Sequence, residues 1–278
     1  MKNSRIGFIG GGNMARSLVG GLVADGVPPA SLVVAEPDPA RRAELAARFG
    51  VAVTGNNAEA AGSADVLVLA VKPQVLPGVA EGLAGVLADR APLVVSVAAG
   101  VRTDPLGQWL GGGVPVVRAM PNTPALLRCG ASALFAGVGV DDSQRELAEA
   151  ILRAVGAVTW VDDEALMDVV TALSGSGPAY FFLLMEAMAD AAAGLGLPAA
   201  QARLLTLETA LGAARMAIES EDDVADLRRG VTSPGGTTEA ALERLRADGF
   251  PALVARAIEA ATQRSRALAT RFDKETNG

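Results

Sequence analysis

The sequence predicts an α/β domain built on a parallel sheet, followed by an all-α domain. Short apolar runs alternate with helical patterns in the first half, whereas only helical patterns continue beyond about residue 163. A glycine-rich turn, Gly10-x-Gly12-x-x-Ala15, follows the first apolar run and opens the first helical pattern. Strands that alternate with helices connect through right-handed crossovers, which gives a doubly wound sheet with helices on both faces. The first domain is therefore predicted to be of the Rossmann type.

The strands of this domain are expected at short runs, several of them apolar on both faces as buried parallel strands are. These runs are residues 5–9, 32–35, 66–71, 93–98, 114–119 and 132–136. Helical patterns at residues 14–25, 39–49 and 75–87 supply crossovers between them. We expect residues 1–162 to form this Rossmann-type domain.

The second half is expected to be helical throughout. The helical patterns are residues 164–173, 179–195, 198–219, 224–229, 237–248 and 251–271, with Pro198 and Pro251 at favoured first-turn positions. Two long helices, residues 179–195 and 198–219, are apolar nearly all round, which requires burial against more than one layer. Residues 163–278 are therefore expected to form a helical domain for dimerisation and substrate binding.

Composition excludes several classes of function. The net charge of −7 and an aromatic content of 4% argue against binding to nucleic acid. Cys129 is the single cysteine, so neither an intramolecular disulfide nor a CxxC metal site is expected. The stretch 180–197 is interrupted by Glu186 and Asp190, and no signal peptide is evident, so we expect no membrane span and a cytoplasmic location.

The glycine-rich turn predicts a pyrophosphate site. Its glycines permit a tight turn and a close approach of the backbone, while the N–H groups and dipole of the next helix face the negative charge. This makes a nicotinamide or flavin cofactor the leading hypothesis. The cofactor contacts expected in this turn are Ile9, Gly10, Gly12, Asn13 and Met14.

The end of the second strand bears on the choice between NADH and NADPH. Glu36 stands where a carboxylate accepts hydrogen bonds from the adenosine ribose, which favours NADH. Arg41 and Arg42 follow closely, and their charges are suited either to a 2′-phosphate or to solvent. Both cofactors therefore stay open.

Three further loops follow strands and are expected at the carboxyl edge of the sheet, where ligands of open α/β folds bind. They are Ala70-Val71-Lys72-Pro73, residues 96–100 and the segment Met120-Pro121-Asn122-Thr123-Pro124. Each alone is an ordinary turn. Together they would surround a nicotinamide ring with small residues and backbone polar groups.

Two loops of the second half are candidates for substrate binding. Residues 233–239, SPGGTTE, lead into a helix whose first N–H groups suit a carboxylate or phosphate, although a plain helix cap is the alternative. Residues 174–178, SGSGP, interrupt two helical patterns and form either a ligand contact or a helix corner. Residues 221–223, EDD, form either a solvated helix start or a contact for a cationic nitrogen.

The residues that are missing restrict the chemistry. The chain has no histidine, and lysine occurs only at Lys2, Lys72 and Lys274. The usual general acids of dehydrogenases are therefore absent from the second half.

These motifs, taken in order, resemble those of the pyrroline-5-carboxylate reductase family. The segments GFIGGGNMA, AVKPQ, MPNTPALL, SGSGPAYFF, EAMADAA, LGAARM and VTSPGGTTEAAL carry the likeness over nearly the whole chain. The resemblance implies hydride transfer from NADPH or NADH to L-1-pyrroline-5-carboxylate, which gives L-proline in the last step of proline biosynthesis. It also implies dimers that assemble further, as a pentamer of dimers in many members.

The resemblance also implies roles for single residues. The nicotinamide is expected at Ala70, Val71, Lys72 and Ala98, beside Pro73, and the adenosine ribose near Asn57. Thr238 is the expected catalytic residue, with its hydroxyl beside the ring nitrogen of the substrate. The other expected substrate contacts are Ser233, Gly236, Thr237, Ser176, Glu164 and Glu221.

Imine reduction is consistent with the missing residues. A cyclic imine arrives protonated, so hydride addition leaves a neutral amine and no oxyanion to stabilise. A β-hydroxyacid dehydrogenase is a rival with the same outline, but it relies on a lysine in the helical domain, and none stands between Lys72 and Lys274. A nucleotide-sensing protein is a second rival, although it needs no second anion site like residues 233–238.

Overall fold

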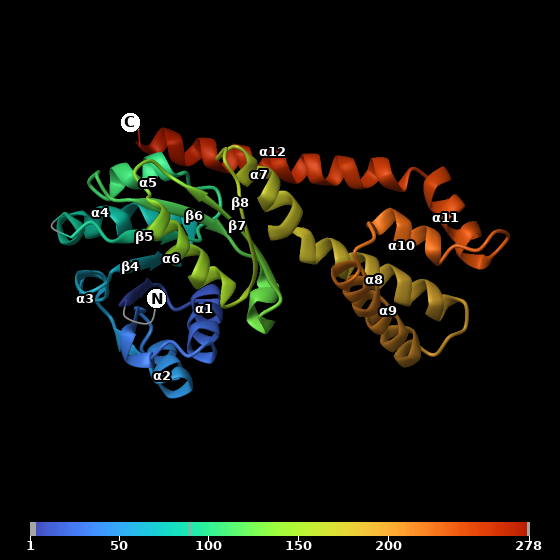
Figure 1. Ribbon diagram of the computed structural model, residues 1–278, viewed down its shortest axis with the longest axis horizontal. Helices are drawn as coiled ribbons and strands as arrows, with labels where there is room; N and C mark the ends of the chain where they lie inside the picture. Colours follow the sequence, from blue (N-terminus) through green and yellow to red (C-terminus); the bar gives the residue numbers. More distant parts are fainter. Residues whose placement is uncertain (1–3, 89, 277–278) are drawn as a thin grey trace. The chain divides into compact units, whose positions relative to one another are not determined.

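The structure, a computed structural model, describes residues 4–88 and 90–276, with side chains described as far as Phe272 (Figure 1). Two compact units are found. Unit 1 comprises Met1–Ser176 and Ala260–Gly278, and unit 2 comprises Gly177–Glu259. This division by packing differs from the expected boundary between residues 162 and 163, because the end of the last helix packs on the α/β unit and buries Phe272 there.

Unit 1 contains an eight-stranded sheet in the order β3-β2-β1-β4-β5-β6-β7-β8. The strands are β1 (Ile6–Ile9), β2 (Leu32–Ala35), β3 (Ala52–Thr54), β4 (Val66–Leu69), β5 (Leu93–Ser96), β6 (Val116–Met120), β7 (Gly130–Ala136) and β8 (Gly156–Trp160). The first six are parallel, and β7 runs antiparallel to β6. The strand order reverses between β1 and β4, which is where such sheets bind ligands.

Helices cover both faces of this sheet. On one face, Ile6 and Phe8 of β1 pack in a core with α1 (Asn13–Ala24), α2 (Pro39–Phe49) and α6 (Asp142–Arg153). On the other face, Ile9 shares a core with α3 (Asn57–Gly62), α4 (Leu76–Leu87) and α5 (Thr103–Trp109). Successive strand residues point to opposite faces, so the strands read as unbroken apolar runs.

The predicted α/β architecture is confirmed, with a strand at each of the expected runs. The prediction missed β3, β8 and the helices α3, α5 and α6. One strand of the sheet departs from the parallel pattern: β7 is antiparallel to β6, since only the short 3₁₀ turn Thr123–Leu127 lies between them. A parallel return would need a crossover of a dozen or more residues.

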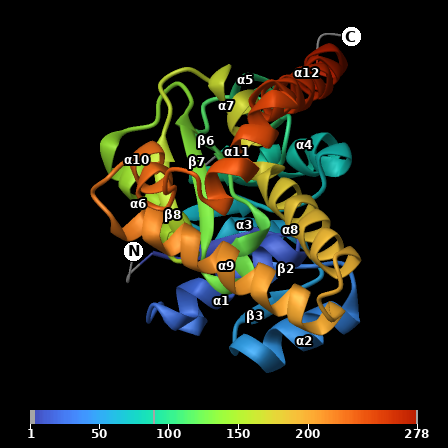
Figure 2. The same cartoon turned by 90° about the vertical axis from the view of Figure 1, so that its right-hand side faces the viewer.

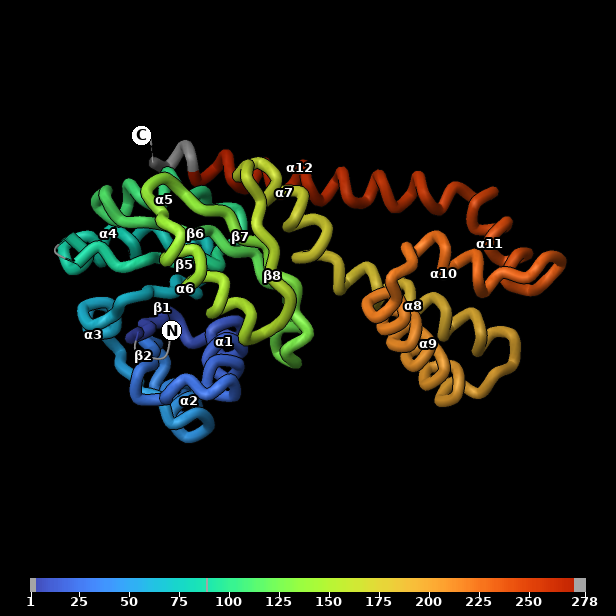
Figure 3. Tube along the Cα trace, in the orientation of Figure 1, coloured from blue at the N-terminus to red at the C-terminus, as the bar shows by residue number. Residues whose placement is uncertain are grey.

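The remaining helices follow the last strand (Figure 3). They are α7 (Leu166–Val170), α8 (Gly177–Gly194), α9 (Ala199–Glu219), α10 (Val224–Gly230), α11 (Thr237–Ala247) and α12 (Phe250–Thr276). The expected helix 164–173 is instead α7 followed by a π-helical turn, Thr171–Gly175. In unit 2, α8 and α9 pack along each other (Figure 2) and leave many large apolar side chains exposed.

Candidate functional site

The glycine turn after β1 is shaped to hold an anion. Gly10 adopts a φ of 95°, and its N–H donates to the Ala35 carbonyl at 2.8 Å. A Cβ at Gly10 would lie 2.7 Å from the Ala70 carbonyl oxygen, so no side chain fits there. Gly12 is the N-cap of α1, and no side chain caps its first N–H groups. These donors therefore stay open to a ligand.

The predicted cofactor residues of this turn are of two kinds: one is buried under the turn, and the others border open space. The Ile9 side chain is buried in the core, and its carbonyl accepts the Ala70 N–H at 2.8 Å, so it supports the turn from below. A Cβ at Gly12 would meet no atom within 4 Å, which leaves open space above the turn. Asn13 and Met14 form the first residues of α1 behind that space.

Glu36, at the end of β2, is buried and held by the main chain. Its carboxylate accepts the N–H of Gly11 at 2.8 Å and that of Asp38 at 3.1 Å, and the residue is 5% exposed. The Arg42 guanidinium donates to the carbonyls of Glu36 and Pro37, at 2.6 and 2.9 Å. The nearest charge at the end of β2 is therefore a fixed carboxylate, while Arg42 is turned to the backbone.

A cavity of about 460 Å³ lies next to this strand end, between the loop that follows β3 and the helix α4. Its lining residues are Gly55, Asn56, Asn57, Ala58, Val75, Gly78, Val79, Gly82 and Leu83. Asn56 is the N-cap of α3, accepting the Ala58 N–H at 2.9 Å, whereas Asn57 lines the cavity. The cavity offers apolar walls and an amide group, which suit an adenosine.

The loops after β4 and β5 place the other cofactor candidates at the same edge. Ala70, Val71 and Pro73 are half-buried, and Lys72 is exposed. Ala98 is 3% exposed, and its N–H lies 3.4 Å from the Ser96 hydroxyl. Because β4 and β5 are adjacent parallel strands, the residues that follow them lie beside the glycine turn.

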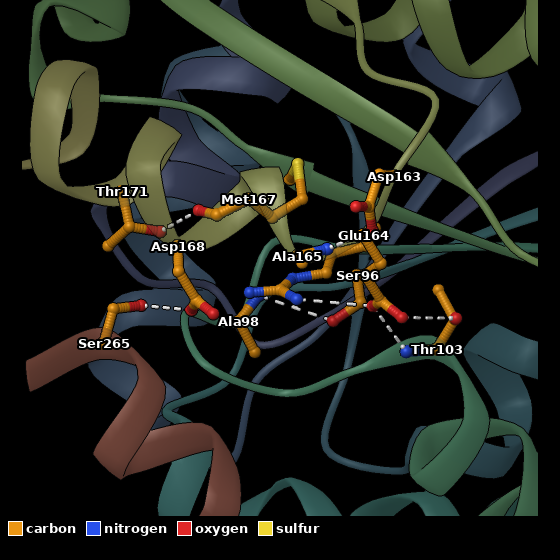
Figure 4. A network of polar contacts seen from close by, with 11 residues as sticks. Ser96, Ala98, Thr103, Asp163, Glu164, Ala165, Met167, Asp168, Thr171 and Ser265 are labelled. Atoms are coloured by element: carbon orange, nitrogen blue, oxygen red, sulfur yellow. Dashed lines mark hydrogen bonds and ion pairs between the residues drawn. The ribbon is translucent and has the colours of Figure 1, made fainter. Parts of the chain in front are cut away.

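Glu164 is engaged in a network on the sheet (Figure 4). Its carboxylate accepts the Thr103 N–H at 2.9 Å, the Thr103 hydroxyl at 3.1 Å and the Arg118 guanidinium at 3.3 Å. Arg118 is 3% exposed, so Glu164 neutralises a buried cation on β6. Thr103 is the first residue of α5, which makes Glu164 a cap for that helix.

A second buried acid lies close to this network. The Ser265 hydroxyl of α12 donates to the Asp168 carboxylate of α7 at 2.6 Å, and both residues are buried (Figure 4). Sequence reasoning missed Thr103, Arg118 and Asp168. A charged residue inside the apolar strand VVRAM was the available signal for Arg118, since a buried charge needs a partner.

The loop before α11, in unit 2, forms a second open helix start. Gly236 is the N-cap of α11, and no side chain caps it. The Gly236 N–H donates to the Ser233 carbonyl at 3.0 Å, and the Glu239 carboxylate accepts the Gly235 N–H at 2.6 Å. These bonds shape the turn without using the N–H groups of Thr237 and Thr238, which are the donors an anion needs.

Glu221 lies in the loop between α9 and α10 and is exposed. The neighbouring Asp223 is the residue that caps α10, accepting the Asp226 N–H at 2.9 Å. Glu221 and the Ser233–Thr238 loop therefore belong to unit 2, whereas Glu164 and Ser176 belong to unit 1 with the cofactor candidates.

The described part of the chain carries neither a candidate metal site nor a candidate membrane span. No group of three or more acidic, histidine or cysteine side chains is arranged to hold a metal ion there. Nor is any helix of those residues both long and apolar enough to cross a bilayer.

The chain is similar to known pyrroline-5-carboxylate reductases over nearly its whole length. Residues 164–268 match the family model for pyrroline-5-carboxylate reductase dimerisation, and residues 5–100 match that for NADP oxidoreductase, coenzyme F420-dependent. The reductase of Pseudomonas aeruginosa is 55% identical over 269 residues, which cover 97% of this chain and 98% of the relative.

Solved structures give the same result. A pyrroline-5-carboxylate reductase from Coxiella burnetii is 48% identical, with a TM-score of 0.93 over 96% of this chain and 98% of that one. The Plasmodium falciparum enzyme with NADP bound is 29% identical, with a TM-score of 0.85 over 97% and 99%. The chain belongs to the pyrroline-5-carboxylate reductase family.

Proposed function

We propose that this chain reduces the C=N bond of L-1-pyrroline-5-carboxylate with NADH or NADPH and releases L-proline, the last step of proline biosynthesis. Family membership supports the reaction. The observation that carries the proposal is a pair of helix starts without side-chain caps, at Gly12 and at Gly236. One suits the pyrophosphate of a dinucleotide, and the other suits the carboxylate of a small acid.

The cofactor would be held along the carboxyl edge of the sheet. Gly10, Gly12, Asn13 and Met14 would bind the pyrophosphate, while Glu36 and Asn57 would hold the adenosine ribose. Ala70, Val71, Lys72, Pro73 and Ala98 would line the nicotinamide. The bound cofactor supplies a hydride, and these residues fix the direction from which it leaves.

The substrate would be clamped by the turn before α11. The N–H groups and hydroxyls at Ser233, Gly236, Thr237 and Thr238 would bind its carboxylate, and the Thr238 hydroxyl would hold the ring nitrogen in line. Glu221 is a further candidate for this cationic nitrogen. Hydride adds to the imine carbon, the C=N π electrons move to the protonated nitrogen, and a neutral amine results. Alignment of the nicotinamide C4 with the imine carbon at about 3–3.5 Å in a water-poor site would lower the barrier by several kcal/mol.

Self-association follows from the dimerisation domain, and we propose a homodimer that assembles into a pentamer of dimers in the cytoplasm. The exposed apolar side chains of α8 and α9 support the dimer, since a monomer would leave them in water. Measurement of the native mass in solution distinguishes a dimer from a decamer.

The direct test uses the purified full-length chain with L-1-pyrroline-5-carboxylate and each cofactor in turn. We expect NAD(P)H absorbance to fall and proline to accumulate in equal amounts. Failure to form proline with either cofactor would refute the proposed function.

A further inference from the structure

The π-helical turn Thr171–Gly175 lies beside the loop that follows β6. The Ser176 N–H donates to the Thr171 carbonyl at 2.9 Å, a bond across five residues instead of the four of an α-helix. The Thr171 and Ser174 hydroxyls donate to the Met167 and Val170 carbonyls, at 2.7 and 3.1 Å (Figure 4 shows the former). Such turns are less stable than α-helix and are found frequently at functional sites.

One side chain, Asn122, fixes this turn to the sheet. Asn122 comes two residues after β6, and its Nδ2 donates to the Ser174 carbonyl at 3.1 Å. Its Oδ1 accepts the N–H of Ala131, in β7, at 2.9 Å. A single half-buried amide therefore joins the π-turn, the β6 loop and the start of β7.

The packing under the turn is equally specific. A Cβ at Gly175 would overlap the terminal methyl of Met120, the last residue of β6, so the turn packs directly on this side chain. Among the described residues, the Ser176 hydroxyl donates no hydrogen bond, which leaves it available to a ligand. The turn thus presents one free hydroxyl close to the carboxyl end of β6.

We propose that Asn122 is a positioning residue that holds the π-turn and Ser176 as a wall of the nicotinamide site. The inference rests on the proposed function. β6 pairs directly with β5, and the chain leaving β5 carries Ala98, so the two strand ends border the same part of the carboxyl edge. Ser176 then contacts the nicotinamide side of the site, and Asn122 acts through it without touching a ligand.

The substitution Asn122→Asp tests this bond alone. The aspartate still accepts the Ala131 N–H, but its second oxygen faces the Ser174 carbonyl and repels it when ionised. We expect kcat to fall about tenfold at pH 8, the effect of one lost hydrogen bond plus repulsion. The KM for NAD(P)H should change little, because the adenosine and pyrophosphate contacts are remote from Asn122.

A lower pH should rescue this variant. A carboxyl group that faces a carbonyl is favoured in its protonated form, and its O–H then donates to Ser174 as the amide does. The titrating group is the introduced carboxyl, and both hydrogen-bond partners of the Asn122 side chain in the described part of the chain, in β7 and the π-turn, are uncharged main-chain groups. The ratio of variant to wild-type kcat should therefore rise between pH 8 and about pH 5.5, whereas a merely structural defect gives a constant ratio.

The controls separate this proposal from the proposed function. Gln108→Glu introduces a carboxyl group at an exposed position of α5, outside the proposed site, and should keep wild-type kinetics. An Asn122→Asp variant with wild-type kcat at pH 8, or with a loss that does not recover relative to wild type, overturns the positioning role. If the wild type reduces no imine, the proposed function fails instead. In that case Asn122→Asp must still perturb the fluorescence of bound NADH in a pH-dependent way for the positioning role to stand.

Discussion

The Glu36 carboxylate accepts the backbone N–H of Gly11 at 2.8 Å and so ties the end of β2 to the glycine turn after β1. Its second oxygen is held by the Asp38 N–H, and Arg42 donates to main-chain carbonyls instead of to this carboxylate. A fixed negative charge therefore lies where the adenosine ribose is proposed to bind. This carboxylate can accept hydrogen bonds from the ribose hydroxyls, but it repels a 2′-phosphate.

Replacing Glu36 by serine should shift the cofactor preference. We expect the ratio of kcat/KM with NADPH to that with NADH to rise at least about tenfold, since a close like-charge repulsion is removed. Glu36→Gln separates charge from geometry, because its amide oxygen still accepts the Gly11 N–H. Glu81→Ser, an exposed change of the same charge on α4, is the control. A strong NADPH preference that Glu36→Ser leaves unchanged would contradict this reading.

Replacing Gly12 by alanine should impair cofactor binding without impairing folding. The added methyl meets no protein atom within 4 Å, so the free energy of unfolding should change by less than about 1 kcal/mol. The same methyl projects into the space proposed for the pyrophosphate, so the Kd for NADH should rise at least about tenfold. Calorimetry and fluorescence titration measure the two effects. Equal NADH affinity in both proteins would place the pyrophosphate elsewhere.

Replacing Thr238 by alanine should lower turnover while cofactor affinity stays near normal. Loss of the hydroxyl removes the group proposed to hold the ring nitrogen, and we expect kcat to fall roughly 100-fold. Thr238→Ser keeps a hydroxyl and should recover most of the activity. Thr232→Ala, just after α10, removes a hydroxyl that donates to the Arg228 carbonyl of that helix, and it serves as the control. Full activity of Thr238→Ala would remove Thr238 from the mechanism.

A charge on the apolar face of α9 should dissociate the dimer. Leu205 is 56% exposed in the single chain, next to Leu204 at 59%. In the Leu205→Glu variant, dimer formation would bury a carboxylate at a cost of roughly 3 kcal/mol or more, which raises the Kd of the dimer at least about 100-fold. Sedimentation velocity measures the change, and Gln201→Glu, at an exposed polar position of the same helix, is the control. Dimers of unchanged affinity would show that this face lies outside the interface.

The fall in the free energy of unfolding at acid pH should depend in part on Glu149. The Trp160 indole N–H donates to this carboxylate at 2.7 Å, and together with Arg153 it lowers the pKa of Glu149. A lowered pKa stabilises the fold at pH values above the ordinary value of about 4.3, and the contribution is lost as pH falls through the lowered pKa. Urea unfolding should show Glu149→Gln less stable by up to about 1 kcal/mol at pH 7, and this difference should shrink as the pH falls through the lowered pKa of Glu149. A difference that does not shrink in acid would contradict this assignment.

Periodicity predicted the buried strands well because residues buried on both faces form continuous apolar runs. It missed β8 because Gly156–Trp160 alternates between half-buried and exposed side chains, and β3 because it is short and poorly buried. α6 could have been found, since Asp141 and Gln144 form a capping box. The glycine turn and the position of Glu36 at the end of β2 were predictable because both follow from local sequence, while their contacts with a cofactor stay predictions.

The rest of the site depends on contacts distant in sequence. Glu164 meets Arg118 across 46 residues and Thr103 across 61, and no local pattern joins them. Asn122 was visible within MPNTP, but its bond to Ser174 requires the π-turn, which periodicity does not predict. The roles of Thr238, Glu221 and Ser176 in catalysis stay predictions.

The ion pair between Glu164 and Arg118 means that the α/β half cannot be cut out at residue 162 without loss of stability. A fragment ending at residue 162 would contain every strand, yet it would leave Arg118 buried without its carboxylate and uncover the apolar socket that Phe272 fills. An unpaired buried charge alone costs about 3–5 kcal/mol, comparable to the whole stability of many domains. The nucleotide-binding half therefore depends for its stability on Glu164 and on the end of α12, which follow it in the sequence, and it is not an independent module.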